Sequence, residues 1–319
     1  NEPVVYCTDL PFLYFLYSLP FASLPSKTEL LYKYPFLLYD KYNKKHEYVR
    51  KDSVMFNFFI IMDENLGNTI ARHFSSKYLN YTINFIISKE FPSFSDFPDF
   101  SLVLCDLDQN IELAKKYNLP AIAFSHENNK QETLMGTPWM ILDADALSPF
   151  FLREVYCRHH HIPLMITTTS RCTIRELTVK QLPKLLLLQK ENKNNPSGCF
   201  FPQNCCTTVA AETFLLDYIK NQYSFYGYGI YGIFKKTDDA FLGIAGFSPL
   251  ENTEDYYVEI GYSILKEWQR QGFASEVLPA LLHFEKEYLR FTEVITRIEK
   301  ENIASIRLAK KNLLRIITI

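Results

Sequence analysis

The first half of the chain contains short, mainly apolar runs that alternate with stretches of helical spacing. After the first run, Leu66, Ile70 and Phe74 recur at the spacing of one helix face. Mainly apolar runs indicate strands buried on both faces, and their alternation with helices indicates a parallel sheet. The predicted strands are residues 56–62, 83–87, 102–105, 121–124 and 140–142, and the predicted helices are residues 66–78, 110–117 and 149–158. We therefore predict an α/β fold class, with a Rossmann-like parallel-sheet domain over residues 1–165.

The second half has a different pattern, in which amphipathic helices frame a set of strand-like runs separated by polar turns. Such runs predict an antiparallel meander. The predicted helices are residues 179–190, 212–222, 274–290 and 303–311, and the predicted strands are residues 172–177, 229–235, 241–248, 257–265 and 293–299. Residues 161–169 are interpreted as the linker that precedes the first of these strands. We expect an α+β domain with a mixed, mostly antiparallel sheet over residues 166–319.

Length, composition and charge indicate a globular protein of two domains and argue against some partners, but they do not indicate a function. A length of 319 residues suits two domains, and 47% hydrophobic with 22% charged residues is typical of globular proteins. The formal net charge of −2 argues against nucleic acid as the main partner, because phosphate-binding surfaces usually carry a basic excess. No run approaches the ~20 apolar residues of a transmembrane helix, so we expect no membrane partner.

The cysteines indicate reduced thiols. There are seven, an odd number without repeated CxxC pairs, which fits neither a disulfide framework nor a zinc site. A cytoplasmic location is therefore expected. Cys157 lies close to His159, His160 and His161, but adjacent histidines on one element cannot all face one ion, so no metal is expected.

A short segment before the long helix of the second half carries the first chemical signal. Residues 269–274 read Gln-Arg-Gln-Gly-Phe-Ala and stand between a predicted strand and a predicted helix. Such a junction leaves backbone N–H groups unpaired, and the helix dipole makes the position attractive to phosphate. Gly272 allows close approach of the backbone to a ligand, and Ala274 is small for the same reason. The segment alone is a weak signal, and its context decides its weight.

That context resembles the GNAT superfamily of N-acetyltransferases, especially the ribosomal-protein N-terminal acetyltransferases. Four segments follow in the order typical of the family over about residues 173–314. They are the Thr-Ile-Arg-Glu-Leu strand from Thr173, the Glu-Ile-Gly-Tyr strand from Glu259, residues 269–274 with the helix that follows, and the Asn-x-x-Ser helix start at Asn302.

The resemblance implies that acetyl-CoA is the co-substrate and that its acetyl group passes directly to a primary amine. It implies splayed strands that leave backbone groups of Tyr262, Ser263 and Ile264 to pair with the pantetheine arm. It places the pyrophosphate on the backbone N–H groups of Gln269, Arg270, Gln271, Gly272, Phe273 and Ala274. Asn302 reaches the cofactor, and so does Ser305, which lies one turn further along the same helix face. The acceptor is a peptide amino terminus or a small molecule such as a polyamine or an antibiotic.

The transfer also needs groups that move protons. A base must take the ammonium proton of the acceptor, and an acid can protonate the leaving thiolate. Glu259 stands at the family's glutamate position and is the expected base, with a solvated or salt-bridged strand residue as the alternative. A backbone N–H of the same strand would polarise the thioester carbonyl.

Three positions depart from the family pattern. Ala309 stands where many members carry the tyrosine that acts as general acid, so Ser305 or water is expected to replace it. Leu313 and Leu314 stand where Gly-Phe usually closes the last helix. The chain reaches Ile319 where one more strand is expected, so we expect that strand to be missing. These departures favour an alternative function, a sensor or scaffold that binds acetyl-CoA without turnover.

The first half faintly resembles the haloacid-dehalogenase-like fold at residues 102–124. Asp106 and Asp108 would suit a Mg²⁺-dependent phosphatase, but Asp63-Glu64-Asn65 departs from the nucleophile motif of that family. A non-catalytic module is therefore expected, which binds a small ligand, shapes the acceptor site or mediates assembly. A homodimer is left open.

Overall fold

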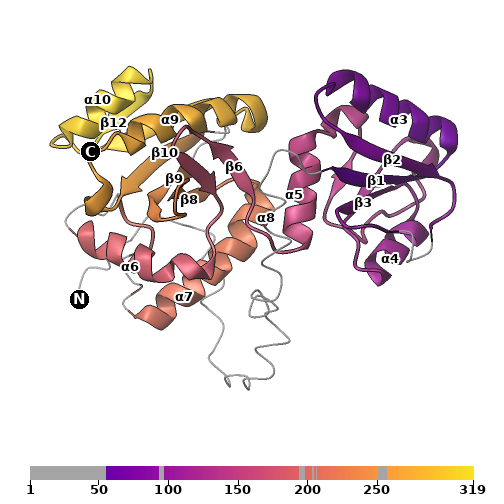
Figure 1. Ribbon diagram of the computed structural model, residues 1–319, viewed down its shortest axis with the longest axis horizontal. Coiled ribbons are helices and arrows are strands. Elements are labelled where there is room, and N and C mark those ends of the chain that lie inside the picture. Colours follow the sequence, from indigo (N-terminus) through magenta and orange to yellow (C-terminus); the bar gives the residue numbers. More distant parts are fainter. Residues whose placement is uncertain (1–54, 93–96, 194–197, 203–204, 206, 251–256) are drawn as a thin grey trace, which may run out of the picture. The chain divides into compact units, whose positions relative to one another are not determined.

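The computed structural model describes residues 55–319 apart from residues 93–96, 194–197, 203–204, 206 and 251–256. The described residues divide into two compact units that meet in sequence between Leu164 and Met165 (Figure 1). Each unit has its own sheet, and the two sheets differ in strand direction. The expected α/β class with one parallel and one mixed sheet is confirmed.

The first unit is built on a five-stranded parallel sheet in the order β2-β1-β3-β4-β5. All six residues of β1 and all five of β3 are buried, as their apolar runs predicted. Polar side chains cap the first N–H groups of two helices. Asp63 caps α3, and Ser148 caps α5, which has a proline in its first turn. The elements are β1 (Phe56–Ile61), α3 (Glu64–Lys77), β2 (Ile83–Ser88), β3 (Ser101–Cys105), α4 (Asp108–Lys116), β4 (Ala121–Phe124), β5 (Met140–Ile141) and α5 (Pro149–His159).

The second unit is built on a seven-stranded sheet in the order β12-β11-β10-β9-β8-β7-β6. Strands β6 to β10 pair antiparallel in succession, whereas β10 with β11 and β11 with β12 are parallel. Helices α9 and α10 lie on one side of this sheet and α6 and α7 on the other (Figure 1).

The helices of this unit are α6 (Leu182–Glu191), α7 (Thr208–Asp217), α8 (Tyr223–Tyr226), α9 (Phe273–Phe284) and α10 (Ile303–Lys311). The strands are β6 (Met165–Thr168), β7 (Cys172–Arg175), β8 (Ile230–Lys235), β9 (Phe241–Pro249), β10 (Tyr257–Ile264), β11 (Glu293–Ile298) and β12 (Arg315–Thr318). Two predicted helices, residues 212–222 and 274–290, continue in the structure into π-helical turns at Tyr218–Gln222 and Glu285–Leu289.

The interpretation of residues 161–169 as a linker is wrong. Met165 to Thr168 form strand β6, which pairs antiparallel with β7. Threonine fits a strand because of its β-branched side chain. However, the two threonines follow two buried apolar residues, so the segment lacks the alternation that marks a half-buried strand. The pairing with β7 completes this edge of the sheet.

The expectation that the last strand is missing is also wrong. Residues Arg315–Thr318 form β12 and pair parallel with β11 from Ile295 to Ile298. The chain turns out of α10 at Leu313, whose φ of 57° lies in the left-handed region usually taken by glycine at this point of a helix end. Four residues are enough for the strand, because the turn from α10 into β12 is short.

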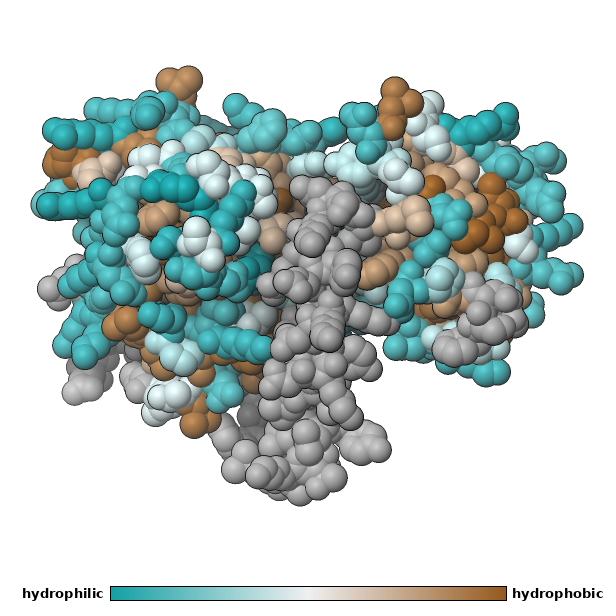
Figure 2. All heavy atoms as spheres, viewed as in Figure 1, coloured by the Kyte–Doolittle hydropathy of each residue, from teal (hydrophilic) through white to brown (hydrophobic). Residues whose placement is uncertain are grey.

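The surface of the second unit is mainly hydrophilic on the face seen in Figure 2, with apolar side chains scattered between polar ones. Its interior is apolar, and one buried cluster joins α6 and α7 to β8 and β9 through residues such as Leu185, Phe214 and Phe234. No helix in the described part of the chain combines the length and the apolar character that a bilayer crossing needs.

Candidate functional site

Strands β10 and β11 separate in the middle of the second sheet. Their parallel pairing covers only Tyr257 to Glu259 opposite Glu293 to Ile295. Strand β10 nevertheless continues to Ile264, paired with β9 throughout, and β11 continues to Ile298, paired with β12. The edge of β10 that faces β11 therefore has no strand partner among the described residues beyond Glu259. We call this opening the splay. An unpaired strand edge of this kind offers backbone hydrogen bonds to an extended ligand.

The splay contains the three residues predicted to pair with a pantetheine arm, Tyr262, Ser263 and Ile264. Several of their groups are already engaged within the protein. The Ser263 hydroxyl accepts a hydrogen bond from Asn192 Nδ2 at 2.9 Å, and the Ile264 carbonyl accepts one from Gln269 Nε2 at 2.8 Å. Gly261 also faces open space, since a Cβ built on it would meet no described atom within 4 Å.

The predicted phosphate loop, residues 269–274, follows the end of β10. Gln269 holds the loop to the strand, and Gln271 Nε2 donates to the carbonyl of Glu267 at 2.9 Å. Gly272 has a φ of 83° and precedes α9 as its N-cap, without any side-chain cap. The first N–H groups of α9 are therefore not capped by a side chain, and together with the helix dipole they can hold an anion.

Arg171 stands beside this loop, and the sequence patterns did not single it out. Its Nη1 donates to the carbonyl of Gln271 at 3.1 Å, and its guanidinium lies 4.4 Å from the ring centroid of Phe273. A Cβ on Gly272 would have only Arg171 Nη2 near it, at 3.5 Å. The residue lies 100 positions or more before its partners in the chain, so only the fold brings this cation to the loop.

Glu276 in the first turn of α9 anchors Arg171. It accepts hydrogen bonds from Thr169 Oγ1, from Ser170 Oγ at 2.9 Å, and from the backbone N–H and Nε of Arg171 at 2.7 and 2.8 Å. Burial disfavours the charged carboxylate, but the hydrogen bonds from Thr169, Arg171 and Ser170 outweigh it and lower the pKa of Glu276 to about 2. The network joins the β6–β7 turn to the start of α9.

Because of this network, the folding stability of the protein should depend on pH in the acidic range. The folded-state pKa of Glu276 lies below its ordinary value of 4.5, so its contribution is fully present above about pH 4.5 and is lost as the pH falls towards about 2. We expect the urea midpoint of the wild type to fall over this range more than that of Glu276→Gln, measured by circular dichroism. Glu267→Gln is the control, because Glu267 is 54% exposed and pairs only loosely with Lys184 at 3.4 Å. Equal acid sensitivity of the wild type and Glu276→Gln would contradict the prediction.

Glu259, the predicted base, lies at the last paired position of β10 and is ion-paired. Its Oε1 accepts from the backbone N–H of Arg297 at 3.2 Å, and its Oε2 accepts from Nε and Nη2 of Arg297 at 2.8 and 2.7 Å. Both carboxylate oxygens are thus engaged by one residue of β11. To accept a proton directly, the carboxylate has to part from Arg297, or a water molecule has to lie between it and the amine.

Of the two predicted residues at the start of α10, Ser305 contacts a residue of the splay and Asn302 caps the helix. Asn302 caps α10, with its Oδ1 accepting from the Ser305 N–H at 3.2 Å. The Tyr262 hydroxyl donates to Ser305 Oγ at 3.0 Å. Burial raises the pKa of Tyr262, although the bond to Ser305 opposes it, so the phenol keeps its proton at neutral pH. The fold thereby joins two predicted residues through side chains, whereas the sequence had suggested only a backbone role for Tyr262.

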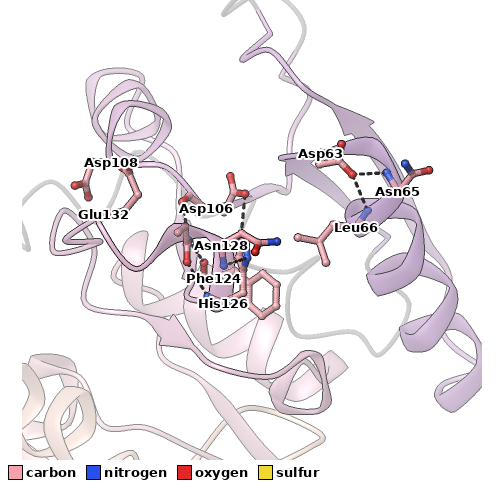
Figure 3. Close-up of polar contacts among 10 residues, drawn as sticks. Asp63, Asn65, Leu66, Asp106, Asp108, Phe124, His126, Asn128 and Glu132 are labelled. Carbon is pink, nitrogen blue, oxygen red and sulfur yellow. Dashed lines mark hydrogen bonds and ion pairs between the residues drawn. The ribbon is translucent and has the colours of Figure 1, made fainter.

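In the first unit, the polar residues after β3 and β4 form a separate cluster at the carboxyl edge of the parallel sheet (Figure 3). Asp106 Oδ2 contacts His126 Nε2 at 3.2 Å. His126 Nδ1 accepts from the Asn128 N–H at 3.4 Å, so both ring nitrogens are engaged. Asn129 Nδ2 donates to the backbone carbonyl of Asp106 at 2.8 Å. Within the described ranges, Asp106 Oδ1 is buried without a hydrogen-bond partner.

The other candidate acids of this unit have structural partners. Asp108 accepts from the backbone N–H groups of Thr133 and Leu134 at 2.9 and 2.7 Å, and the Thr133 bond is the main reason that the pKa of Asp108 is lowered. Asp63 accepts from two N–H groups at the start of α3. Among the residues that the structure describes, no three His, Cys, Asp or Glu side chains are arranged to hold a metal ion.

Comparison with known proteins finds that most of the second unit is similar to one family. Residues 171–313 match the family model described as an acetyltransferase (GNAT) domain. This segment contains the splay, residues 269–274 and the start of α10. The match confirms the expected acetyltransferase domain, and acetyl-CoA is the co-substrate of this class of enzymes.

Solved structures similar to this chain include three acetyltransferases. A GNAT-family acetyltransferase from Bacillus anthracis is 20% identical with a TM-score of 0.37, and the match covers 46% of this chain and 80% of that one. A ribosomal L7/L12 alpha-N-protein acetyltransferase in complex with coenzyme A is 22% identical with a TM-score of 0.40, covering 47% and 82%. An acetyl transferase from Salmonella typhimurium, which modifies the N-terminal serine of ribosomal protein L7/L12, is 20% identical with a TM-score of 0.38, covering 47% and 83%.

Proposed function

We propose that this chain, which carries a GNAT acetyltransferase domain, moves the acetyl group of acetyl-CoA to a primary amine by direct attack on the thioester. The observation that carries the proposal is the splay between β10 and β11, which lies next to the uncapped start of α9. An extended pantetheine arm and a diphosphate need these two features side by side. We assign this activity to residues 166–319.

The coenzyme is held by backbone groups and one cation in this proposal. Tyr262, Ser263 and Ile264 pair with the pantetheine arm, and the N–H groups from Gln269 to Ala274 hold the diphosphate. Arg171 adds a guanidinium next to Gly272. Asn302 still has its amide NH₂ group to offer the coenzyme, because the helix cap uses only its oxygen.

The cationic amine must lose two protons to become an amide, one before the attack and one after it, and the sulfur must gain one. The amine nitrogen attacks the thioester carbon, and a backbone N–H of β10 stabilises the oxyanion. Glu259 takes the amine proton through a water molecule, because Arg297 occupies its oxygens directly. The carbon–sulfur bond then breaks, and Ser305 protonates the thiolate while it receives the Tyr262 proton along their hydrogen bond. The second proton of the nitrogen returns through water to Tyr262, so that only the proton taken by Glu259 is released.

We also propose an acceptor, a role for the first unit and a cellular location. A primary amine is cationic in water and suits the carboxylate of Glu259, so we propose a peptide amino terminus or a small polyamine-like molecule. We propose residues 1–165 as a non-catalytic Rossmann-like module, because Asp63 and Asp108 accept hydrogen bonds from backbone N–H groups and Asp106 contacts His126. We propose a cytoplasmic location, since the buried Cys105 and Cys172 are thiols. A homodimer is compatible with this proposal.

A sensor or scaffold that binds acetyl-CoA without turnover is the second candidate. The ion pair between Glu259 and Arg297 favours it, because a base engaged in this way is not ready to accept a proton. Ala309 at the position of the usual tyrosine acid favours it too.

Release of coenzyme A thiol in the presence of a panel of peptides and small amines tests the proposal. We expect amine-dependent thiol release, and we expect Ser305→Ala to lower kcat by roughly a hundredfold because the leaving thiolate loses its acid. Coenzyme binding should fall far less than kcat in this variant. Thr213→Ala, which removes an exposed hydroxyl on α7 outside the splay, serves as the control. Tight acetyl-CoA binding with no thiol release for any amine would favour the sensor.

A further inference from the structure

We infer that Glu259 and Arg297 form a spacer that stops β10 and β11 from pairing beyond Glu259 and so keeps the coenzyme slot open. Both are positioning residues in this role. The inference rests on the proposed function, since it takes the splay as the slot for the pantetheine arm. It assigns to Arg297 a role that its exposed position on β11 does not suggest.

The first observation is that neither strand leaves the sheet where the pairing stops. After Glu259, β10 stays in register with β9 as far as Ile264 opposite Gly243. After Ile295, β11 stays in register with β12 as far as Ile298 opposite Thr318. Both strands are therefore extended and available, and a specific feature must keep them apart.

The second observation identifies that feature. If the parallel ladder continued, the backbone N–H of Arg297 would donate to a backbone carbonyl of β10. It donates instead to Glu259 Oε1 at 3.2 Å. A side-chain carboxylate thus replaces the backbone acceptor at the first position after the paired segment.

The geometry of this replacement widens the gap. Paired strands lie about 4.8 Å apart, which leaves room for one direct N–H to carbonyl bond and no group between. Here a carboxylate lies in that path, and its other oxygen is held by Nε and Nη2 of Arg297 at 2.8 and 2.7 Å. The guanidinium fixes the carboxylate so that it cannot swing away and let the strands close.

The ion pair between Glu259 and Arg297 is not expected to contribute much to the stability of the fold. The Glu259 side chain is 17% exposed and that of Arg297 is 44% exposed, so solvent screens their attraction. Exposed pairs of this kind contribute little to folding. The position of the pair, at the point where the splay opens, is what gives it a function.

Titration calorimetry of the full chain with coenzyme A tests the spacer without turnover. We expect Glu259→Ala to weaken binding by about tenfold or more, because the strands can close into the slot. Glu259→Gln keeps an oxygen acceptor for the Arg297 N–H and should weaken binding only a few-fold. The double variant Glu259→Ala with Arg297→Met should weaken coenzyme A binding no more than Glu259→Ala alone, because the two residues act as one unit.

Arg315→Met is the matched control. Arg315 on β12 forms the other cross-strand ion pair of β11, with Glu293 at 3.0 Å, and lies outside the splay. We expect unchanged coenzyme binding in this variant. A pure base role predicts a different pattern: Glu259→Ala and Glu259→Gln lose thiol release equally and bind coenzyme A as the wild type does. That pattern would overturn the spacer and leave the proposed transferase intact.

Amide hydrogen exchange of the protein without ligand separates the two ideas further. Closure of the strands in Glu259→Ala should slow exchange of the β10 and β11 amides beyond Glu259, whether or not the protein binds coenzyme A. Unchanged or faster exchange there would contradict the spacer. Wild type that fails to bind coenzyme A, with slowed exchange in Glu259→Ala, would instead refute the proposed function and keep the structural role of the pair.

Discussion

Gly272→Glu is expected to abolish measurable binding of acetyl-CoA to this protein. The substitution puts a carboxylate at the start of α9, where the diphosphate is proposed to lie. Two unit charges about 4 Å apart near a protein surface repel by about 4 kcal/mol. Even half of that value raises Kd about thirtyfold. Titration calorimetry with acetyl-CoA measures the effect, and wild-type affinity in the variant would place the coenzyme elsewhere.

Backbone strain has to be separated from this electrostatic effect. Gly272 has a φ of 83°, so any side chain there costs about 1–2 kcal/mol of stability. Gly227→Glu is the matched control, because Gly227 has a φ of 71° and a Cβ on it would meet no described atom within 4 Å. It should lose similar stability and keep its coenzyme affinity. Equal loss of binding in both variants would indicate unfolding rather than repulsion.

Gly246→Ala is expected to unfold the acetyltransferase unit or to weaken it severely. A Cβ on Gly246 would lie 2.1 Å from the carbonyl oxygen of Gly229 and 2.8 Å from Cα of Ile230. Both are backbone atoms, so the chain must shift where β8 meets β9. We expect a loss of at least about 3 kcal/mol. For a unit of this size the thermal midpoint should fall by roughly 6–12 °C.

Gly261→Ala provides the control, because Gly261 pairs with Gly246 across β9 and β10. A Cβ on Gly261 would meet no described atom within 4 Å. Its thermal midpoint should stay within about 2–4 °C of the wild type, since removing a glycine also restricts the unfolded chain. Similar losses in both variants, measured by differential scanning calorimetry, would show that contact with Gly229 is not the cause.

Local pattern predicted most of the elements because their signals are contained within a few residues. The buried runs of β1, β3 and β4 appeared as apolar runs, and the predicted helix 303–311 has the bounds of α10. β6 was missed because its apolar and polar residues do not alternate, and β12 because the resemblance suggested that the chain ended too early. In both cases the strand is formed by its pairing with a neighbour, which a local pattern does not contain.

In the candidate site, too, some residues could be predicted from a local sequence pattern and others depend on long-range contacts. Residues 269–274 could be predicted from sequence as a phosphate loop, because the candidate is one continuous segment with glycine at a helix start. Arg171 and Arg297 were not found, because an arginine without periodic spacing carries no signal of its partner. The pairing of Tyr262 with Ser305 was equally invisible, since the two residues lie 43 positions apart.

By itself, the sequence determined the two sheet types, the resemblance to the acetyltransferases and the loop before α9. These follow from short-range preferences, since burial, helix spacing and a glycine at a turn act over a few residues. The resemblance implied that strands splay near Tyr262, but only the tertiary structure decided that β10 and β11 part directly after Glu259, and that the expected base is held by Arg297. Both depend on which strand edges and charges meet in space, and those long-range pairings are set by the packing of the whole unit.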